Sequence, residues 1–150
     1  MSVYEFTISL RVRHPSVDPV EITRTLGIEP LHTWRVGEPR VGPAGEPLDG
    51  VYRESYWMAR LMDEPELSSG LVSVESVLLR TLAQLRRSLQ FLAELNSDGG
   101  VAEVHVSIFA RGDFRLDFLA ESLALLGKLG LALTLDVQPA PGPEAGESLS

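Results

Sequence analysis

The chain has 150 residues, no cysteine and a formal net charge of −8, which suits one domain with one core and excludes disulfides and thiolate metal sites. No apolar run approaches the roughly 20 residues that cross a bilayer, and the N-terminus has no secretory-signal pattern, so we expect a cytoplasmic protein without membrane contact. Nucleic-acid binding relies on Lys and Arg that neutralise phosphates, and the acidic balance argues against it.

The first third of the chain predicts one strand, one short helix and a long connection. Apolar and polar residues alternate strictly over residues 3–13, which predicts a half-buried strand. A helix of about two turns follows, because Asp18 can cap its N-terminus and Gly27 suits a left-handed C-terminus. Residues 29–50 hold Pro and Gly at close intervals, which excludes a helix or a long central strand. A connection this long is usually functional or disordered, and Trp34 argues against full disorder.

The rest of the chain alternates strands and helices. Residues 51–61 predict a second strand, and its mixed faces are compatible with a sheet edge. Residues 73–95 form the strongest helical pattern, with leucines and valines at three- and four-residue steps that make one apolar stripe. A strand over 101–110, a third helix and a final strand over 131–137 complete the pattern.

The resulting order is β-α-β-α-β-α-β. It predicts a single α+β domain over residues 1–137, built as a two-layer sandwich with about four strands and the helices on one face, related to ferredoxin-like folds. Residues 138–150 are rich in Pro, Gly and Glu, so we expect a disordered tail.

The segment from His32 to Arg40 gathers aromatic, basic and polar residues outside any amphipathic pattern. As a binding lip, it would offer the flat apolar ring of Trp34, while Arg35 and Arg40 would hold a carboxylate. The alternative is structural: Trp34 plugs an open edge of the core, and Arg35 pairs with Glu38 on the surface.

Two further candidates lie on predicted strands. Trp57 would form a second wall of the same pocket if it lay on the open sheet face, although aromatics on strands are more often core residues. His105 is expected on the solvated face, where it could act as a general base near neutral pH. Glu29 and His32 have a metal-ligand spacing, but Pro30 breaks the helix which that spacing needs. We therefore predict no metal, cofactor or catalytic residues.

Several motifs in this chain occur together in a known family. They are Asp18-Pro19-x-Glu21-Ile22, Leu26-Gly27-Ile28-Glu29-Pro30, Trp34-Arg35-x-Gly37-Glu38 and the aromatic strand that contains Trp57. With them the chain resembles the bacterial domain of unknown function 4279 family over residues 3–137. In the family a Gly often precedes the tryptophan of the second strand, whereas Tyr56 stands there in this chain. The resemblance implies a small α+β domain and brings no established activity.

The sequence leaves two functional hypotheses open. The first is a non-enzymatic binding domain, similar in role to an immunity or regulator protein, that engages a protein partner through the Pro/Gly-rich loop around Trp34. Residues 61–150 hold 6 basic and 13 acidic groups, which would speed encounter with a basic partner. The alternative is a regulatory domain in which Arg35 or Arg40 grips a small carboxylate metabolite. Either would act as a monomer or a homodimer.

Overall fold

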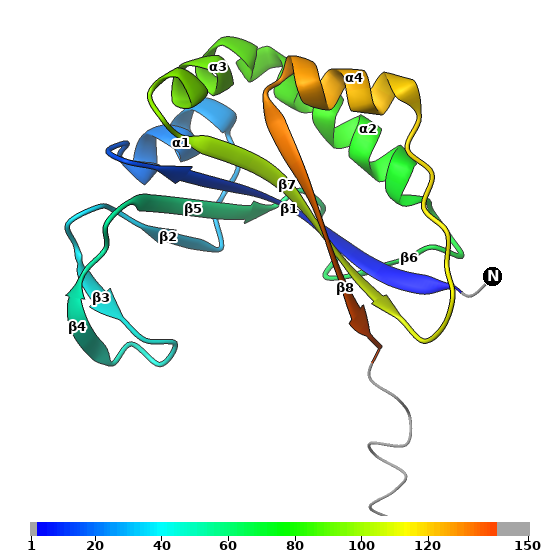
Figure 1. Cartoon of the computed structure of the whole chain (residues 1–150), viewed down its shortest axis with the longest axis horizontal. Coiled ribbons are helices and arrows are strands. Elements are labelled where there is room, and N and C mark those ends of the chain that lie inside the picture. The colour runs from blue at the N-terminus through cyan, green and yellow to red at the C-terminus, as the bar shows by residue number, and fades with distance from the viewer. Residues whose placement is uncertain (1–2, 141–150) are drawn as a thin grey trace, which may run out of the picture.

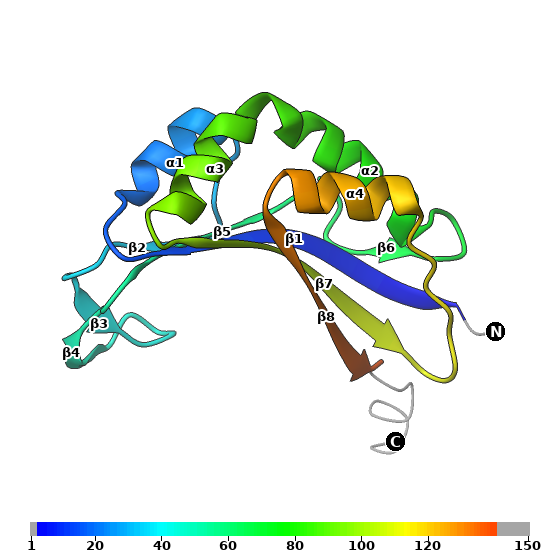
Figure 2. The same ribbon diagram turned by 45° about the horizontal axis from the view of Figure 1, so that its top comes forward.

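A mixed sheet with helices on one face makes up the computed structural model, which describes residues 3–140 (Figures 1 and 2). The main sheet consists of β1 (Tyr4–His14), β2 (His32–Trp34), β5 (Ser55–Arg60), β6 (Leu67–Ser68), β7 (Val101–Ala110) and β8 (Leu131–Pro139). The helices are α1 (Pro19–Leu26), α2 (Val74–Leu85), α3 (Leu89–Ser97) and α4 (Ala120–Lys128), with a 3-10 turn η1 (Arg86–Ser88) between α2 and α3. A separate hairpin of β3 (Pro39–Val41) and β4 (Pro47–Val51) projects from one end (Figure 1).

β1 lies at the centre of the main sheet. The strand order is β2-β5-β1-β7-β8, and β6 pairs with β1. β1 runs antiparallel to β5 and β7, whereas β8 runs parallel to β7 after the crossover through α4. The α+β class is confirmed, but the sheet has six strands, not four, and the ferredoxin-like order is not confirmed. The extra strands β2 and β6 have two or three residues each, too few for alternation to reveal them.

β5 is an interior strand that pairs with β1 on one side and β2 on the other. The edge position compatible with the pattern of residues 51–61 is therefore wrong. The strand is shorter than predicted, and within it burial alternates cleanly: Ser55, Trp57 and Ala59 face the core. The mixed pattern arose because the predicted range ran into the end of β4.

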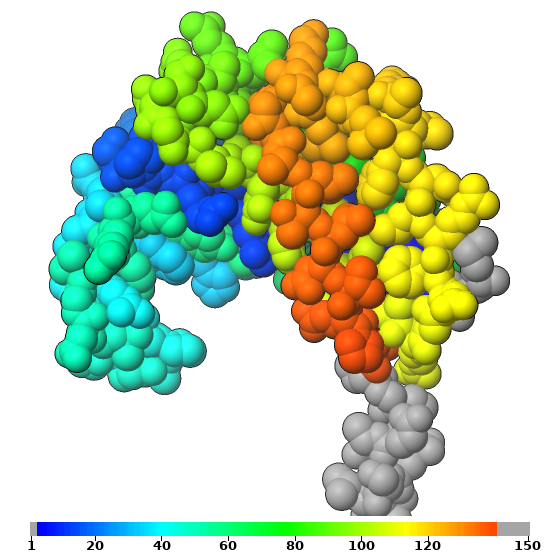
Figure 3. Space-filling model, viewed as in Figure 1, coloured from blue at the N-terminus to red at the C-terminus, as the bar shows by residue number. Residues whose placement is uncertain are grey.

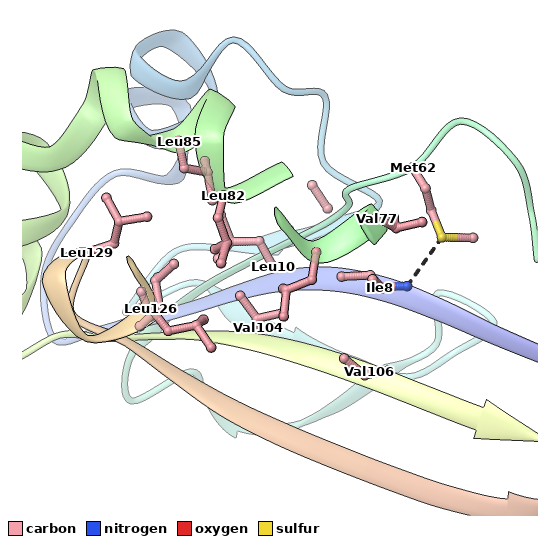
Figure 4. Packing of buried hydrophobic residues seen from close by; sticks show 14 of the residues in the cluster. Ile8, Leu10, Met62, Val77, Leu82, Leu85, Val104, Val106, Leu126 and Leu129 are labelled. Carbon is pink, nitrogen blue, oxygen red and sulfur yellow. Dashed lines mark hydrogen bonds between the residues drawn. The ribbon is translucent and has the colours of Figure 1, made fainter. Parts of the chain in front are cut away.

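The core fills the space between the sheet and the helices (Figure 4). Leu10 of β1 and Val104 of β7 lie beneath Leu82 and Leu85 of α2, and all four are buried. The apolar stripe predicted for residues 73–95 therefore faces the core, although η1 divides that helix in two. Within the described part of the chain, no helix is both long and apolar enough to cross a membrane.

Local signals define the ends of α1 as predicted. The Asp18 carboxylate accepts a hydrogen bond from the Val20 N–H (3.1 Å), and Gly27 adopts a left-handed φ of 69°. At the other end of the chain, β8 continues to Pro139, so residues 138–139 belong to a strand and not to the expected tail. The rest of that expected tail, residues 141–150, lies outside the described residues.

Candidate functional site

The sheet face opposite the helices carries three of the seven predicted site residues. Cross-strand register places Trp34 beside Tyr56, and His32 beside Met58, on this open face. His105 lies on the same face, two strands away on β7. The space-filling view shows a hollow between the β3–β4 hairpin and the end of β8 (Figure 3). The fold therefore brings His32, Trp34 and His105 to one side of the molecule.

Trp34 is held in place by two tyrosine rings. Its indole stacks on Tyr52 with ring centroids 4.5 Å apart and an interplanar angle of 11°, and on Tyr56 at 4.5 Å and 22°. Offset stacks of this kind stabilise beyond the area that they bury. These contacts use much of the flat indole surface of Trp34.

The base of the hairpin is fixed by hydrogen bonds on both sides of a tight turn. The Gly37 N–H donates to the Tyr52 carbonyl (2.8 Å), and the Tyr52 N–H donates to the Glu38 carbonyl (3.0 Å). The Glu38 carboxylate accepts from the Arg35 backbone N–H (3.0 Å). Gly37 has a φ of 88°, which a residue with a side chain adopts at a cost. The hairpin is therefore an ordered extension anchored at one end.

Two grooves adjoin the Trp34 stack. The larger, about 770 Å³, is lined in part by His32, Trp34 and Glu38. The smaller, about 590 Å³, is lined in part by Trp34, Arg40 and Arg53. Both volumes lie in the range of small-molecule sites. The structure thus gathers four of the seven predicted residues around adjoining grooves.

Arg35 lies outside these grooves. Its guanidinium donates to the Asp18 carboxylate (3.3 Å) at the N-terminus of α1, on the helix side of the sheet. Its guanidinium forms no ion pair with Glu38, whose hydrogen bonds to Arg35 go to the backbone. The Arg40 guanidinium instead donates to the Asp49 carbonyl within the hairpin (3.2 Å). The two arginines therefore do not converge on one carboxylate position.

Trp57 is a core residue. It is fully buried, and its indole Nε1–H donates to the Thr23 hydroxyl on α1 (2.9 Å). A buried indole N–H usually finds such a partner. Trp57 ties β5 to the first helix and lines neither groove, so the structure removes it from the binding surface.

His105 is buried although it lies on the open face, with only 5% of its surface exposed. Its Nε2 lies 3.7 Å from an Asp136 carboxylate oxygen, and its Nδ1 lies 3.4 Å from the Ser107 hydroxyl. Burial lowers the pKa of His105 below its ordinary 6.5, and the Arg11 guanidinium lowers it further, against the raising effect of Asp136 and Glu103. These surroundings favour the neutral form of the imidazole, and the ring is largely shielded from solvent.

Acidification is expected to destabilise the protein through His105. His105 has its ordinary pKa of 6.5 in the unfolded chain and a lower pKa in the folded chain. The unfolded state therefore binds more protons as the pH drops below 6.5, and the free energy of unfolding decreases as the pH is lowered. His105→Gln should flatten the slope between about pH 7 and pH 5 in urea denaturation. His32→Gln, on an exposed histidine, is the matched control and should keep the wild-type slope. An unchanged slope in His105→Gln would contradict the assignment.

Sequence reasoning missed three residues of this surface: Tyr52, Tyr56 and Arg53. A signal existed, because Tyr52 and Tyr56 are both aromatic and share one face in the predicted second strand. Their contact with Trp34 depends on strand order, which one sequence does not disclose. Within residues 3–140, no group of three or more His, Asp or Glu side chains is arranged to hold a metal ion.

Comparison with known proteins adds a family and no close relative. The sequence model of the family described as "Domain of unknown function (DUF4279)" matches residues 4–140. No curated protein and no solved structure matches the chain. The matched range runs from the start of β1 to just past β8 and so includes the sheet, the helices and the hairpin.

Proposed function

The chain belongs to the DUF4279 family, whose description gives no activity, and we propose that it is a non-enzymatic binding domain for a protein partner. Its role would be similar to that of an immunity or regulator protein. The partner would lie against the β3–β4 hairpin and the neighbouring end of the open sheet face. The hairpin is the single observation that carries this proposal.

Every residue of β3 and β4 is exposed. A two-stranded hairpin is marginally stable alone in water, so the order of this one depends on the contacts of Tyr52 at its base, including the hydroxyl that accepts from the Val41 N–H (3.2 Å). The arm contributes nothing to the buried core. An anchored arm without a core role supports a function in contact with another molecule.

Three apolar side chains make the arm suitable for a protein surface. Val41 and Val51 are each 52% exposed, and Leu48 is exposed as well. Protein interfaces combine an apolar centre with a polar rim, and the grooves beside Trp34 would accept side chains of the partner. Figure 3 shows that the arm borders the hollow under the sheet, so one partner can contact both.

Charge favours a basic partner through the long-range field of the protein. The formal net charge is −8, with 13 acidic against 6 basic groups in residues 61–150. The grooves themselves are mixed, since Arg40 and Arg53 lie with Glu54 along the smaller one. Steering by the whole molecule would raise the association rate, and it would weaken as salt is added.

A substitution on the arm tests the proposal. Val51→Asp should reduce capture of the protein partner from lysate of the source cell by at least about tenfold, because a carboxylate would be buried in the interface. Leu71→Asp is the matched control, since Leu71 is 91% exposed and follows β6, at the opposite end from the hairpin (Figure 1). Equal capture by both variants, each folded by circular dichroism, would contradict the assignment to the arm.

A small carboxylate is the second candidate, supported by the smaller groove. Arg53 lines it with Arg40 and makes no ion pair within the described part of the chain, so its guanidinium is available to a carboxylate. Arg35 is committed to Asp18 and is not part of this site. A metabolite acid that raises the Tm of wild type, but not of Arg53→Gln, would favour this function over the first.

A further inference from the structure

The two edges of the main sheet differ greatly in length. β2 has three residues and leads directly into the Gly37 turn, whereas β8 has nine residues and, among the strands of residues 3–140, pairs with β7 alone. In natural sheets, charged residues, proline or a bulge usually protect a long edge strand from pairing with another chain. β8 carries one charged residue, Asp136, and its only proline is the last residue, Pro139. Its outer edge is therefore an unprotected template for another strand.

The backbone groups on that free edge can be identified. The Ala140 N–H donates to the Ala110 carbonyl of β7 (2.9 Å), and the direction of these groups alternates along a strand. Even-numbered residues of β8 therefore bond to β7, while Leu133, Leu135 and Val137 direct their N–H and C=O groups outward.

We propose that two copies of this chain form a homodimer by antiparallel pairing of β8 with β8, about a two-fold axis at Leu135. In this register Leu135 faces Leu135 and Leu133 faces Val137. Outward groups then meet outward groups, which gives about six backbone hydrogen bonds. The two sheets become one continuous sheet.

The side chains of β8 fit this register on both faces. On the helix side, the pairs of Leu133 with Val137 and of Leu135 with itself are entirely apolar. On the open side, the Thr134 hydroxyl lies opposite the Asp136 carboxylate, and no like charges meet. A register centred on Asp136 would place two carboxylates opposite each other, which is destabilising. Because β8 is complementary to itself about Leu135, we expect a second copy of the chain, and not an unrelated strand, to pair with this edge.

The apolar side chains at the far end of β8 are exposed in a single copy, which supports a surface that a second copy covers. Leu135 is 42% and Val137 52% exposed although both lie on the apolar face. Figures 1 and 2 show the reason: β8 runs out beyond the helix layer, so α4 does not cover its second half. Pairing would bring the exposed leucines and valines of two copies against each other and remove this apolar area from water.

The dimer goes beyond the proposed binding function and does not depend on it. The hairpin lies past β2, at the opposite edge of the sheet from β8. Both hairpins would stay free in the dimer, so the assembly would present two equivalent binding arms. Failure of one proposal leaves the other intact, because Leu135 and Val51 lie on different edges.

Substitutions that place opposite charges at Leu135, on the two-fold axis, test the proposed β8–β8 register. The full wild-type chain is expected to sediment as a dimer at concentrations on the order of 10 µM. Leu135→Glu and Leu135→Lys should each weaken self-association by at least about tenfold, because two like charges meet at the axis. An equimolar mixture of the two variants should recover a dimer, since Glu then faces Lys. Leu71→Glu, a substitution elsewhere on the surface, should stay dimeric.

Salt provides a second readout. Each copy carries a formal charge of −8, so added salt should strengthen the wild-type dimer by screening repulsion and weaken the Glu–Lys heterodimer by screening attraction. A wild-type chain that is monomeric at about 100 µM would overturn the proposal. It would also be overturned by a dimer that survives Leu135→Glu, or by a mixture of folded variants that remains monomeric.

Discussion

Replacing Trp57 with alanine is expected to lower the free energy of unfolding by about 3–5 kcal/mol. The side chain is fully buried between β5 and α1, so its removal leaves a large cavity. It also leaves the Thr23 hydroxyl without its donor, which adds to the cost. Urea denaturation at neutral pH measures the loss, and the m-value shows whether unfolding stays two-state.

The other tryptophan is the control for this experiment. Trp34 is half-buried and stacks on Tyr52 and Tyr56. Each stacked pair of this kind contributes about 0.5–1.5 kcal/mol of stability in addition to that from the surface area it buries. Trp34→Ala should therefore cost less than Trp57→Ala. The reverse order would mean that Trp34 and not Trp57 completes the core. Thr23→Val isolates the hydrogen bond, whose loss should cost about 1–3 kcal/mol.

Leu85→Ala is expected to cost about 2–5 kcal/mol. Leu85 lies at the end of α2, within the apolar stripe, and is buried against the sheet (Figure 4). The packed core around Leu85 can relax only in part to fill the cavity, so most of the lost contacts are not replaced. The same denaturation measurement applies.

Leu71→Ala supplies a comparison with the same chemical change at an exposed position. Leu71 follows β6 and is almost fully accessible to solvent, so its truncation should change stability by less than about 0.5 kcal/mol. A Leu85→Ala variant as stable as Leu71→Ala would mean that the stripe on α2 does not face the core.

Local signals account for what the sequence could predict. Strict alternation identified β1, and the cap at Asp18 with the glycine at Gly27 identified both ends of α1. The apolar stripe on α2 was also predictable from local sequence, because a few helical turns are enough to show its periodicity. The break at η1 was not predictable, since the leucine spacing continues through it.

The candidate site depends on contacts between distant segments, and these were only partly predictable. The loop around Trp34 was identified by composition, but its stacking on Tyr52 and Tyr56 requires the register of β2 with β5. His105 was placed correctly on the open face, yet it is buried there, with Asp136 of β8 3.7 Å away and the charge of Arg11 of β1 acting on its pKa. Arg35 was expected either to hold a carboxylate ligand or to pair with Glu38, and instead it pairs with Asp18. In each case the deciding neighbour lies on another element.

The central position of β1 has a consequence for synthesis of the protein. β1 leaves the ribosome before its neighbours β5 and β7, and its pairing with β7 joins Tyr4 to Ala110. Contacts between such distant residues carry a high entropic cost and slow folding. Until β7 emerges, the apolar face of β1 has no lasting cover, and a nascent chain exposes it to association with other chains. The central strand of the sheet is therefore made well before the strands that enclose it.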